Sequence, residues 1–406
     1  MSVYYIDPVN GCDTFDGLSP DTPKKREHDL PLVPGDTVRF RRGCVIRDVL
    51  DPVSGNEENP VTDSAYGEGP QPTFCGSVDV SDSALWEEIS PHIWRCLAPI
   101  PGDVGNFVFN QDDCTATFRW SKDDLAEQGD FFDSRYSEIE QNLPHSPQEV
   151  LLYSAENPGG YYSHIECVPY HHRTLCRLRS HIVVEDLAFQ NSGVHGLSGA
   201  GEDITIRHCT IRNIGGCAWN RDRRIRFGNG VELWMQGERV LVEDCTFQNI
   251  YDSCVTHQGD GQNTPPAVNF ICRHNTFDTY GMAAFEYRDK LPIQSTFTDN
   301  VCRNAGCGFA MRGEELPRRS EIWPLPMGHH IFLWRIPAAT PGGSLLIACN
   351  TFGAAPVGAA IYSLISPKAE AEITLQENRY TATPFLSRFG GVDYTDADVF
   401  QMATHA

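Results

Sequence analysis

A short pattern recurs seven times between residues 181 and 380, and it constrains the fold more than any other feature of the chain. Each copy is a strand of alternating apolar residues, followed by a polar anchor, one further residue and then a Thr-Phe-like pair. The copies are VVEDLAF (183–189), ITIRHCTI (204–211), VLVEDCTF (240–247), FICRHNTF (270–277), STFTDNVC (295–302), LLIACNTF (345–352) and ITLQENRY (373–380). The anchors are Asp186, His208, Asp244, His274, Asp299, Cys349 and Glu377.

Successive anchors are 22, 36, 30, 25, 50 and 28 residues apart, and the longest spacing is close to two repeats. One strand-containing unit every 20–50 residues or so is the signature of a solenoid. The alternation inside each copy indicates strands rather than helices. We therefore expect an all-β chain that folds as a parallel β-helix solenoid, in which each coil buries its apolar face against its neighbours.

Four segments follow from this pattern. Residues 181–381 are expected to form the regular coils, and residues 1–95, with strands separated by Gly, Pro, Asn and Asp, the N-terminal cap and first coils. Residues 96–180 break the rhythm with strand-like runs and SKDDLAEQ (121–128), whose first serine is placed to cap a short helix. We expect them to form an inserted β-rich subdomain or lid. Residues 382–406 lose the pattern and are expected to cap the C-terminal end.

The formal net charge is −22. Nucleic acids and anionic membranes favour cationic surfaces, so we expect neither as a partner. No apolar run approaches the roughly 18 residues of a transmembrane helix. The opening MSVYYIDP lacks the basic and apolar segments of a signal peptide, which predicts a cytoplasmic protein, or a secreted or periplasmic one if a signal peptide has been removed.

The chain has 15 cysteines and no CxxC pair, which argues against a zinc ribbon. Five lie in copies of the repeat, at Cys209, Cys245, Cys272, Cys302 and Cys349. We expect these five to be buried and to stack from coil to coil, because a free thiol packs like a small apolar group. Disulfides are the alternative, and so many thiols favour a reducing compartment.

A second strand follows several copies of the pattern, and its alternation assigns side chains to two faces. We align GVHGL (193–197), GVELW (230–234), CVTHQ (254–258), AFEYR (284–288) and GFAMR (308–312). The inward set is Val194, Val231, Val255, Phe285, Phe309, Leu233, Tyr287, Met311 and His257. The outward set is His195, Glu232, Thr256, Glu286 and Ala310 in one column, with Trp234, Gln258, Arg288 and Arg312 in the next. An indole beside planar hydrogen-bonding groups is typical of a glycan-binding surface.

Glu232 and Glu286 are the main catalytic candidates. They lie two coils apart, so at about 4.8 Å per coil their backbones would be roughly 9–10 Å apart. That distance is near the upper end for the two carboxyl groups of an inverting glycosidase and above the roughly 5–5.5 Å of a retaining one.

Three further residues are catalytic candidates with structural alternatives. Asp252 and Asp260 flank the intervening strand, although Asp252 is equally suited to cap a turn. His257 faces inward by register, where a neutral core histidine is the simpler interpretation, and acts as an acid or base only if a local twist exposes it. The alternative for the two glutamates is an ion-pair ladder with Arg288 and Arg312.

The N-terminal segments YYIDPVNGCDTFDGLSPDTP (4–23), PGDTVRFRRG (34–43) and AYGEGPQPTFCGS (65–77) add to the repeats. Together they resemble the right-handed parallel β-helix, pectate-lyase-like superfamily of carbohydrate-active enzymes over about residues 1–381. Within it the layout looks most like β-helix glycoside hydrolases, such as the lacto-N-biosidase-like and xylosidase/fucosidase-like groups. Those enzymes use paired acidic residues on adjacent coils, and the resemblance assigns these roles to Glu232, Asp252, Asp260 and Glu286.

Hydrolysis of an oligo- or polysaccharide is the function that this resemblance favours. One glutamate would be the general acid, and another acidic candidate would activate water or attack directly. Trp234 would stack on a sugar ring, and Gln258, Arg288 and Arg312 would orient it. Neither the sugar and linkage nor the oligomeric state follows from the sequence.

Two other functions remain open. In a polysaccharide lyase or uronate epimerase the arginines would neutralise a uronate, and the base would be His257, Tyr287 or His195. The expected acidic groove counts against this function unless carboxylates hold Ca²⁺ there, and the sequence has no DxDxD-type cluster that would mark such a loop. No cofactor is otherwise expected. The third function is non-catalytic glycan binding, as in a tailspike-like protein.

Overall fold

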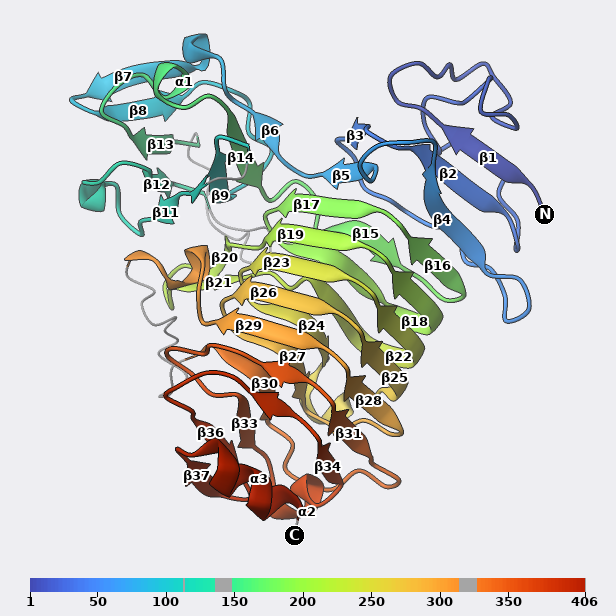
Figure 1. Cartoon of the computed structure of the whole chain (residues 1–406). Helices are drawn as coiled ribbons and strands as arrows, with labels where there is room; N and C mark the ends of the chain where they lie inside the picture. The colour runs from blue at the N-terminus through green and yellow to red at the C-terminus, as the bar shows by residue number, and fades with distance from the viewer. Residues whose placement is uncertain (112–113, 136–147, 314–326, 406) are drawn as a thin grey trace.

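Parallel strands stack in register along most of the chain and form a solenoid (Figure 1). The computed structural model describes residues 1–111, 114–135, 148–313 and 327–405. Two sheets carry the coils, one of 17 strands and one of nine. The long strands β18 (His195–Arg207) and β22 (Val231–Glu243) continue around a corner of the coil, so the larger sheet covers two faces. The predicted all-β parallel β-helix is confirmed.

The coils therefore have three faces. The first face contains the start of β22, β24 (Ser253–Gln258), β27 (Ala283–Arg288), β30 (His329–Trp334) and β33 (Ile361–Leu364). The second contains β16 (Ile182–Glu185), the ends of β18 and β22, β25 (Val268–Arg273), β28 (Ser295–Thr298), β31 (Leu345–Ala348) and β34 (Ile373–Gln376). The third contains β5 (Thr73–Cys75), β17 (Ala188–Ser192), β19 (Thr210–Ile214), β23 (Thr246–Ile250), β26 (Thr276–Tyr280), β29 (Val301–Ala305), β32 (Thr351–Phe352) and β35 (Arg379–Tyr380).

The anchors of the sequence repeat form the corner between the second and third faces. All seven have a positive φ, between 51° and 58°. This left-handed conformation is uncommon for residues with a side chain, so its recurrence marks one sharp turn per coil. Cys349 is one of these anchors and its side chain is exposed, so the prediction that it stacks in the core is wrong. Cys209, Cys245, Cys272 and Cys302 are buried as predicted, and none of the 15 cysteines, all of which lie in the described ranges, forms a disulfide.

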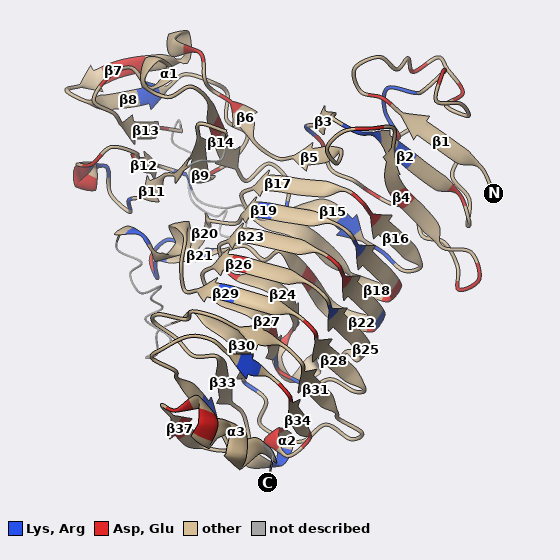
Figure 2. Cartoon of the chain, in the orientation of Figure 1, with Lys and Arg blue, Asp and Glu red and all other residues tan. Residues whose placement is uncertain are grey.

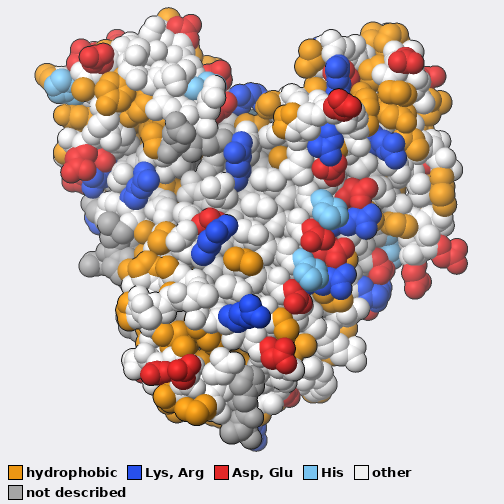
Figure 3. All heavy atoms as spheres, viewed as in Figure 1, with side chains coloured by type: hydrophobic (Ala, Val, Ile, Leu, Met, Phe, Trp, Pro, Cys, Tyr) orange, Lys and Arg blue, Asp and Glu red, His pale blue; other side chains and the backbone are white. Residues whose placement is uncertain are grey.

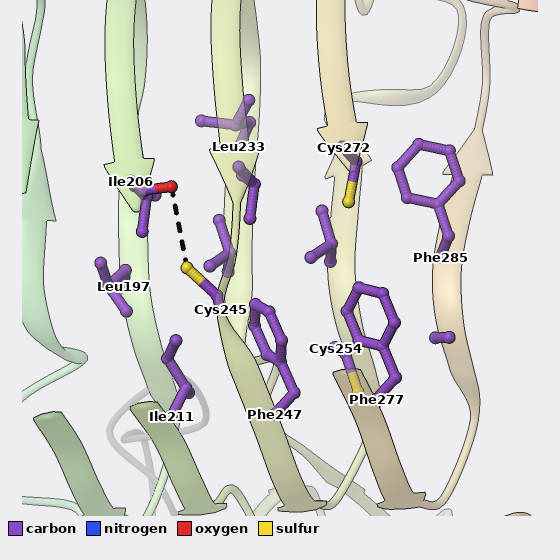
Figure 4. Close-up of a cluster of buried hydrophobic side chains, with 14 of the residues drawn as sticks. Leu197, Ile206, Ile211, Leu233, Cys245, Phe247, Cys254, Cys272, Phe277 and Phe285 are labelled. Carbon is purple, nitrogen blue, oxygen red and sulfur yellow. Dashed lines mark hydrogen bonds between the residues drawn. The ribbon is translucent and has the colours of Figure 1, made fainter. Parts of the chain in front are cut away.

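Aliphatic, aromatic and thiol side chains fill the interior of the coils (Figure 4). The Cys245 thiol donates to the carbonyl oxygen of Ile206 over 3.7 Å. The rings of Phe247 and Phe277 stack with centroids 4.9 Å apart, close to the spacing of successive coils. Equivalent side chains thus pack on one another, and each coil depends on its neighbours for burial.

Four buried asparagines stack directly behind the corner, at Asn275, Asn300, Asn350 and Asn378. The Oδ1 atom of Asn300 accepts the backbone N–H of Asn275 at 2.9 Å and its side-chain N–H at 3.1 Å. Asn350 accepts the same two bonds from Asn300, and Asn378 accepts them from Asn350. The ladder supplies partners for polar groups that the turn would otherwise leave unpaired in the core.

An added subdomain interrupts the coils after β5. Its strands are β6 (Val78–Asp79), β7 (Trp86–Ser90), β8 (Ile93–Cys96), β9 (Val104–Phe109), β10 (Cys114–Thr115), β11 (Thr117–Phe118), β12 (Asp130–Asp133), β13 (Val150–Tyr153) and β14 (Ile165–Pro169). They form a four-stranded and a five-stranded sheet around a separate apolar core. Residues 78–96 thus lie in the added sheets rather than in the first coils. The short helix expected at 121–128 is a single 3₁₀ turn, Lys122–Asp124, capped by Ser121.

A hairpin of β20 (Cys217–Asn220) and β21 (Ile225–Phe227) connects this subdomain to the coils. The Asp103 carboxylate of the subdomain accepts the backbone N–H of Ala218 at 3.0 Å. The Cys217 thiol donates to the carbonyl oxygen of Asp103 at 3.3 Å. The hairpin is thus held from both sides, and it projects beside the first face of the coils.

The two ends of the solenoid are closed differently. At the N-terminus β1 (Val3–Ile6), β2 (Thr37–Arg41) and β4 (Val61–Tyr66) extend the larger sheet. At the C-terminus β36 (Ser387–Phe389), β37 (Val392–Tyr394) and helix α3 (Ala397–His405) cover the last coil (Figure 1). Phe400 of α3 is fully buried against Tyr380 and Phe385, as expected for a cap that shields the core from water.

Asn300→Ala is expected to lower the free energy of unfolding by about 3–5 kcal/mol, because it leaves two buried N–H groups of Asn275 without an acceptor at about 1–3 kcal/mol each. Urea denaturation followed by circular dichroism measures this. The control is Asn263→Ala on the exposed turn η4 (Gly261–Asn263), with an expected change below about 0.5 kcal/mol. Equal stabilities of the two variants would contradict a role for the ladder.

Candidate functional site

A cavity of about 570 Å³ lies over the first face of the coils. The strands contribute Glu232, Trp234, Gln258, Glu286, Arg288 and Trp334 to its wall. The hairpin contributes Trp219, Arg226 and Phe227. Its volume is within the range of sites that bind small molecules. The cavity is therefore the candidate site.

Strand register puts Glu232 and Glu286 in one outward column. Glu232 pairs with Thr256 on β24, and Thr256 pairs with Glu286 on β27. Two steps of about 4.8 Å separate the glutamate backbones by roughly 9–10 Å. The sequence alignment of these three strands therefore agrees with the structure.

The alignment is wrong for the strands on either side. Leu197, not Val194, pairs with Val231, so His195 lies at the start of β18 and Ser198 lies opposite Glu232. The segment 308–312 is not a strand but contains a 3₁₀ turn, Phe309–Met311, and β30 pairs with β27 instead.

Arg312 consequently lies outside the cavity, where it donates to the carbonyl oxygen of Thr115 at 2.5 Å. Trp334 takes the predicted place of Arg312 beside Arg288. The chain inserts residues between β29 and β30, and a strand match based on local spacing cannot detect such an insertion. The predicted contact of Arg312 with substrate is therefore corrected.

Glu232 is buried, and four side chains contact its carboxylate. Oε1 accepts a hydrogen bond from the Ser198 hydroxyl at 3.1 Å, and Oε2 accepts one from the Asn229 amide at 3.0 Å. The Gln258 amide also donates to Oε2. His195 Nε2 lies 3.4 Å from Oε1. A buried carboxylate requires such partners to offset the loss of water.

His195 is oriented by the backbone. Its Nδ1 accepts the N–H of Asn229 at 3.1 Å, which leaves the ring proton on Nε2, directed toward Glu232. Burial lowers the pKa of His195, while the nearby Glu232 opposes this shift. The imidazole is therefore neutral, and its Nε2 lies beside the Glu232 carboxylate.

Glu286 is also buried, with a hydrogen bond to each oxygen. The Ser253 hydroxyl donates to Oε2 at 2.7 Å, and the Trp334 indole N–H donates to Oε1 at 2.7 Å. Asn229 accepts the backbone N–H of Ser253 at 3.1 Å, so one asparagine connects the surroundings of both glutamates. Sequence reasoning missed Asn229, since it lies outside the aligned strand.

The two aspartates differ in position. Asp252 is buried at the start of β24, lines the cavity, and accepts the backbone N–H of Gly228 at 2.8 Å. Asp260 is exposed beyond the end of β24, precedes the turn η4 and does not line the cavity. The structure therefore brings Asp252 to the two glutamates and leaves Asp260 outside.

His257 and Tyr287 are completely buried inside the coil stack. His257 Nε2 lies 2.9 Å from the carbonyl oxygen of Met235, and burial lowers the pKa of His257 to about 4. Burial also raises the pKa of the Tyr287 phenol, whose ring packs on Phe270 and Phe285. Strand alternation directs both side chains away from the cavity, as the predicted inward register requires, and no local twist exposes His257 as an acid or base.

Aromatic rings form much of the cavity wall. Trp234 is 38% exposed and Trp219 of the hairpin 39% exposed, whereas Trp334 is buried. The guanidinium carbons of Arg288 and Arg335 lie 5.6 and 5.4 Å from the Trp334 ring centroid. These are cation–π distances. Trp219 and Trp334 were not predicted, because each lies in or after an inserted segment.

The cavity is not acidic, although the chain is. Both signs of charge are spread over the coils and the subdomain (Figures 2 and 3). The cavity lining includes three carboxylates and five arginines, which are Arg173, Arg224, Arg226, Arg288 and Arg335. The expectation of an acidic groove therefore does not hold at this site.

The described ranges lack two features. They contain no cluster of three or more His, Cys, Asp or Glu side chains arranged to hold a metal ion. No described helix has the length and apolar character needed to cross a membrane.

Comparisons with known proteins identify the fold. The sequence matches the family described as right handed beta helix region over residues 169–315. The chain has the right-handed parallel β-helix fold. No curated protein matches it.

Solved structures have the same β-helix fold. One is the crystal structure of the GH136 lacto-N-biosidase from Eubacterium ramulus, with a TM-score of 0.51, 14% identity, and coverage of 94% of this chain and 56% of that chain. Another is XylC in complex with xylose, with a TM-score of 0.51, 12% identity, and coverage of 93% and 63%. This β-helix thus spans less than two thirds of the length of either protein.

The lowered pKa of His257 predicts a pH effect on stability. Between pH 6.5 and about 4 the unfolded chain binds a proton at this position that the folded chain does not, so acidification favours unfolding. From pH 7 to pH 5 this costs the wild type about 2 kcal/mol. His257→Leu has no group that titrates at this position. The free energy of unfolding of the variant minus that of the wild type should therefore increase by about 2 kcal/mol from pH 7 to pH 5. Urea denaturation at both pH values measures it, and an unchanged difference would contradict a neutral, buried His257.

Proposed function

We propose that the protein is a glycoside hydrolase that cleaves a glycosidic bond in an oligo- or polysaccharide. The observation that carries the proposal is the pair of buried carboxylates, Glu232 and Glu286, which project from one column into one cavity. Glycoside hydrolysis generally uses two carboxyl groups that flank the scissile bond. The two solved structures are, by their titles, a lacto-N-biosidase and a xylose complex, which agrees with a carbohydrate ligand.

The spacing of the glutamates supports a single-displacement mechanism. Carboxyl groups about 6.5–9.5 Å apart leave room for a water molecule, whereas those of a retaining enzyme are about 5–5.5 Å apart. Parallel side chains from the same column keep roughly the separation of their backbones. One glutamate would protonate the leaving oxygen while the other activates water on the opposite side of the sugar. Asp252, at the same wall, is the alternative partner.

The aromatic wall supports sugar binding. The half-exposed Trp234 and Trp219 offer indole surfaces that can pack against the apolar face of a sugar ring. Gln258 lies between Trp234 and Arg288 in the same column, and its amide already fixes Glu232. Binding and chemistry would therefore be coupled through one side chain.

A polysaccharide lyase or uronate epimerase is the second candidate, and Arg288 is the observation that favours it. Such enzymes neutralise a uronate carboxylate before a base removes the adjacent proton. The predicted bases are poorly placed, because His257 and Tyr287 lie inside the coils and His195 directs its N–H toward Glu232. Hydrolysis is therefore better supported than elimination.

Glu232→Gln and Glu286→Gln are each expected to lower kcat by about 10²–10⁴-fold, because each removes a group that transfers a proton in the transition state. Steady-state rates on the glycan with the highest turnover measure this, and binding of the same glycan should persist. Glu58→Gln, at an exposed position, is the matched control. Unchanged kcat in either cavity variant would remove that residue from the proposed pair.

Products heavier than their parent fragments by one water, with an inverted anomeric centre, are expected from a panel of neutral and uronate-containing glycans. Mass spectrometry gives the added water, and proton NMR of the first product formed gives the anomer. Unsaturated products would establish elimination instead. Retention of configuration would point to a nucleophile closer to the acid, such as Asp252, and absence of any product would favour a binding protein.

A further inference from the structure

Arg288 is a cationic side chain that has no hydrogen-bonding partner among the described residues. It follows Glu286 by two positions on β27, so both side chains lie on the outer face and line the cavity. The Arg288 side chain is 20% exposed, and none of its guanidinium nitrogens donates a hydrogen bond within the described residues. Its nearest carboxylate oxygen, Oδ2 of Asp289, is 4.0 Å from Nε. A guanidinium offers five donors in a planar fork, and here none of them has a protein acceptor.

Asp289 does not neutralise this part of the cavity. Its other oxygen lies 3.3 Å from Nε of Arg335, so one carboxylate is shared by two guanidinium groups. The three charges sum to one net positive charge beside the Trp334 ring. Arg288 lies against this ring and the buried Asp289 carboxylate with only 20% of its side chain exposed, so water screens its charge less than that of a surface arginine.

Arg288 is also not the counter-ion of the glutamates. Glu286 takes its hydrogen bonds from Ser253 and Trp334, and none of the described ion pairs joins it to Arg288. The ion-pair ladder considered as the structural alternative is therefore absent from the described contacts of Glu286. By contrast, Arg226 is occupied, since its guanidinium donates to the carbonyl oxygens of Gly216 and Gly105 at 2.5 Å each.

We infer that the sugar bound beside Glu286 carries an anionic group, a carboxylate or a sulfate ester, which Arg288 binds. Hydrolysis of the bound sugar rests on the proposed function, whereas binding of the anionic group rests on Arg288 alone. Arginine matches the two oxygens of such a group with two parallel donors. The net charge of −22 opposes the approach of a densely charged polymer. The favoured substrate is therefore a glycan with isolated acidic sugars among neutral ones.

Binding of single sugars to the whole protein tests the inference without any turnover. The probes share a ring and differ at carbon 6: glucose, glucuronic acid and glucose 6-sulfate, with galactose and galacturonic acid as a second pair. Calorimetry and tryptophan fluorescence measure Kd, since Trp234 and Trp334 line the same cavity. We expect at least one anionic sugar to bind about tenfold or more tightly than its neutral counterpart. The uronate and sulfate arms show which anion is preferred.

Two variants assign the effect to Arg288. Arg288→Gln keeps amide donors but removes the charge, and should raise Kd for the anionic sugar about tenfold or more while leaving the neutral sugar unchanged. Arg39→Gln is the matched control, because Arg39 is exposed on β2 of the same large sheet and outside the cavity. Added salt should weaken the anionic sugar only.

Three results would overturn the inference: equal binding of neutral and anionic sugars, an equal loss of both in Arg288→Gln, or no binding of any anionic probe in the millimolar range. Failure of the proposed function is separate. Tight, Arg288-dependent binding of an acid without hydrolysis of any acidic glycan would leave the recognition intact and reject the hydrolase. Hydrolysis of neutral glycans without preference for acidic ones would support the hydrolase and reject the binding of an anionic group by Arg288.

Discussion

In-register parallel pairing of successive coils is the constraint on which the site depends. Each coil places its strands about 4.8 Å from the next, so residues at equivalent positions form columns whose spacing the backbone fixes. Glu232, Thr256 and Glu286 occupy one such column. The separation of the two carboxylates is therefore a property of the sheet, and a loop movement cannot change it. The left-handed corner and the asparagine ladder keep this register from coil to coil.

The sequence predicts what depends on local alternation. A repeated anchor predicted the coils, and alternation within β22, β24 and β27 put the two glutamates outward and His257 inward. Prediction from alternation fails where an inserted segment separates two strands that pair. The partner of β27 lies beyond an inserted segment, so Trp334 rather than Arg312 completes the second column. The register of β18 against β22 also differs from the alignment, because Leu197 rather than Val194 pairs with Val231. Asn229 lies before the first residue of β22. Alternation within a strand therefore predicts neither the register of β18 nor the role of Asn229.

Burial of two carboxylates in one wall is costly unless each finds donors. Here the donors are neutral: Ser198, Asn229 and Gln258 at Glu232, and Ser253 and Trp334 at Glu286. Neutral donors hold a carboxylate in place without fixing it in a permanent ion pair. Asn229 and the backbone of Ser253 connect the two groups, so that rotation of one side chain disturbs the other.

The same choice of neutral donors explains why Glu286 forms no ion pair with Arg288, whose nearest carboxylate among the described residues is Asp289. Because Glu286 is satisfied by a hydroxyl and an indole, the guanidinium two residues further along β27 remains available. A ligand carboxylate there would bind without competition from Glu232 and Glu286, and its approach would not alter the hydrogen bonds of Glu286. Separation of recognition from proton transfer along one strand is possible because alternate residues share a face and lie about 6.6 Å apart.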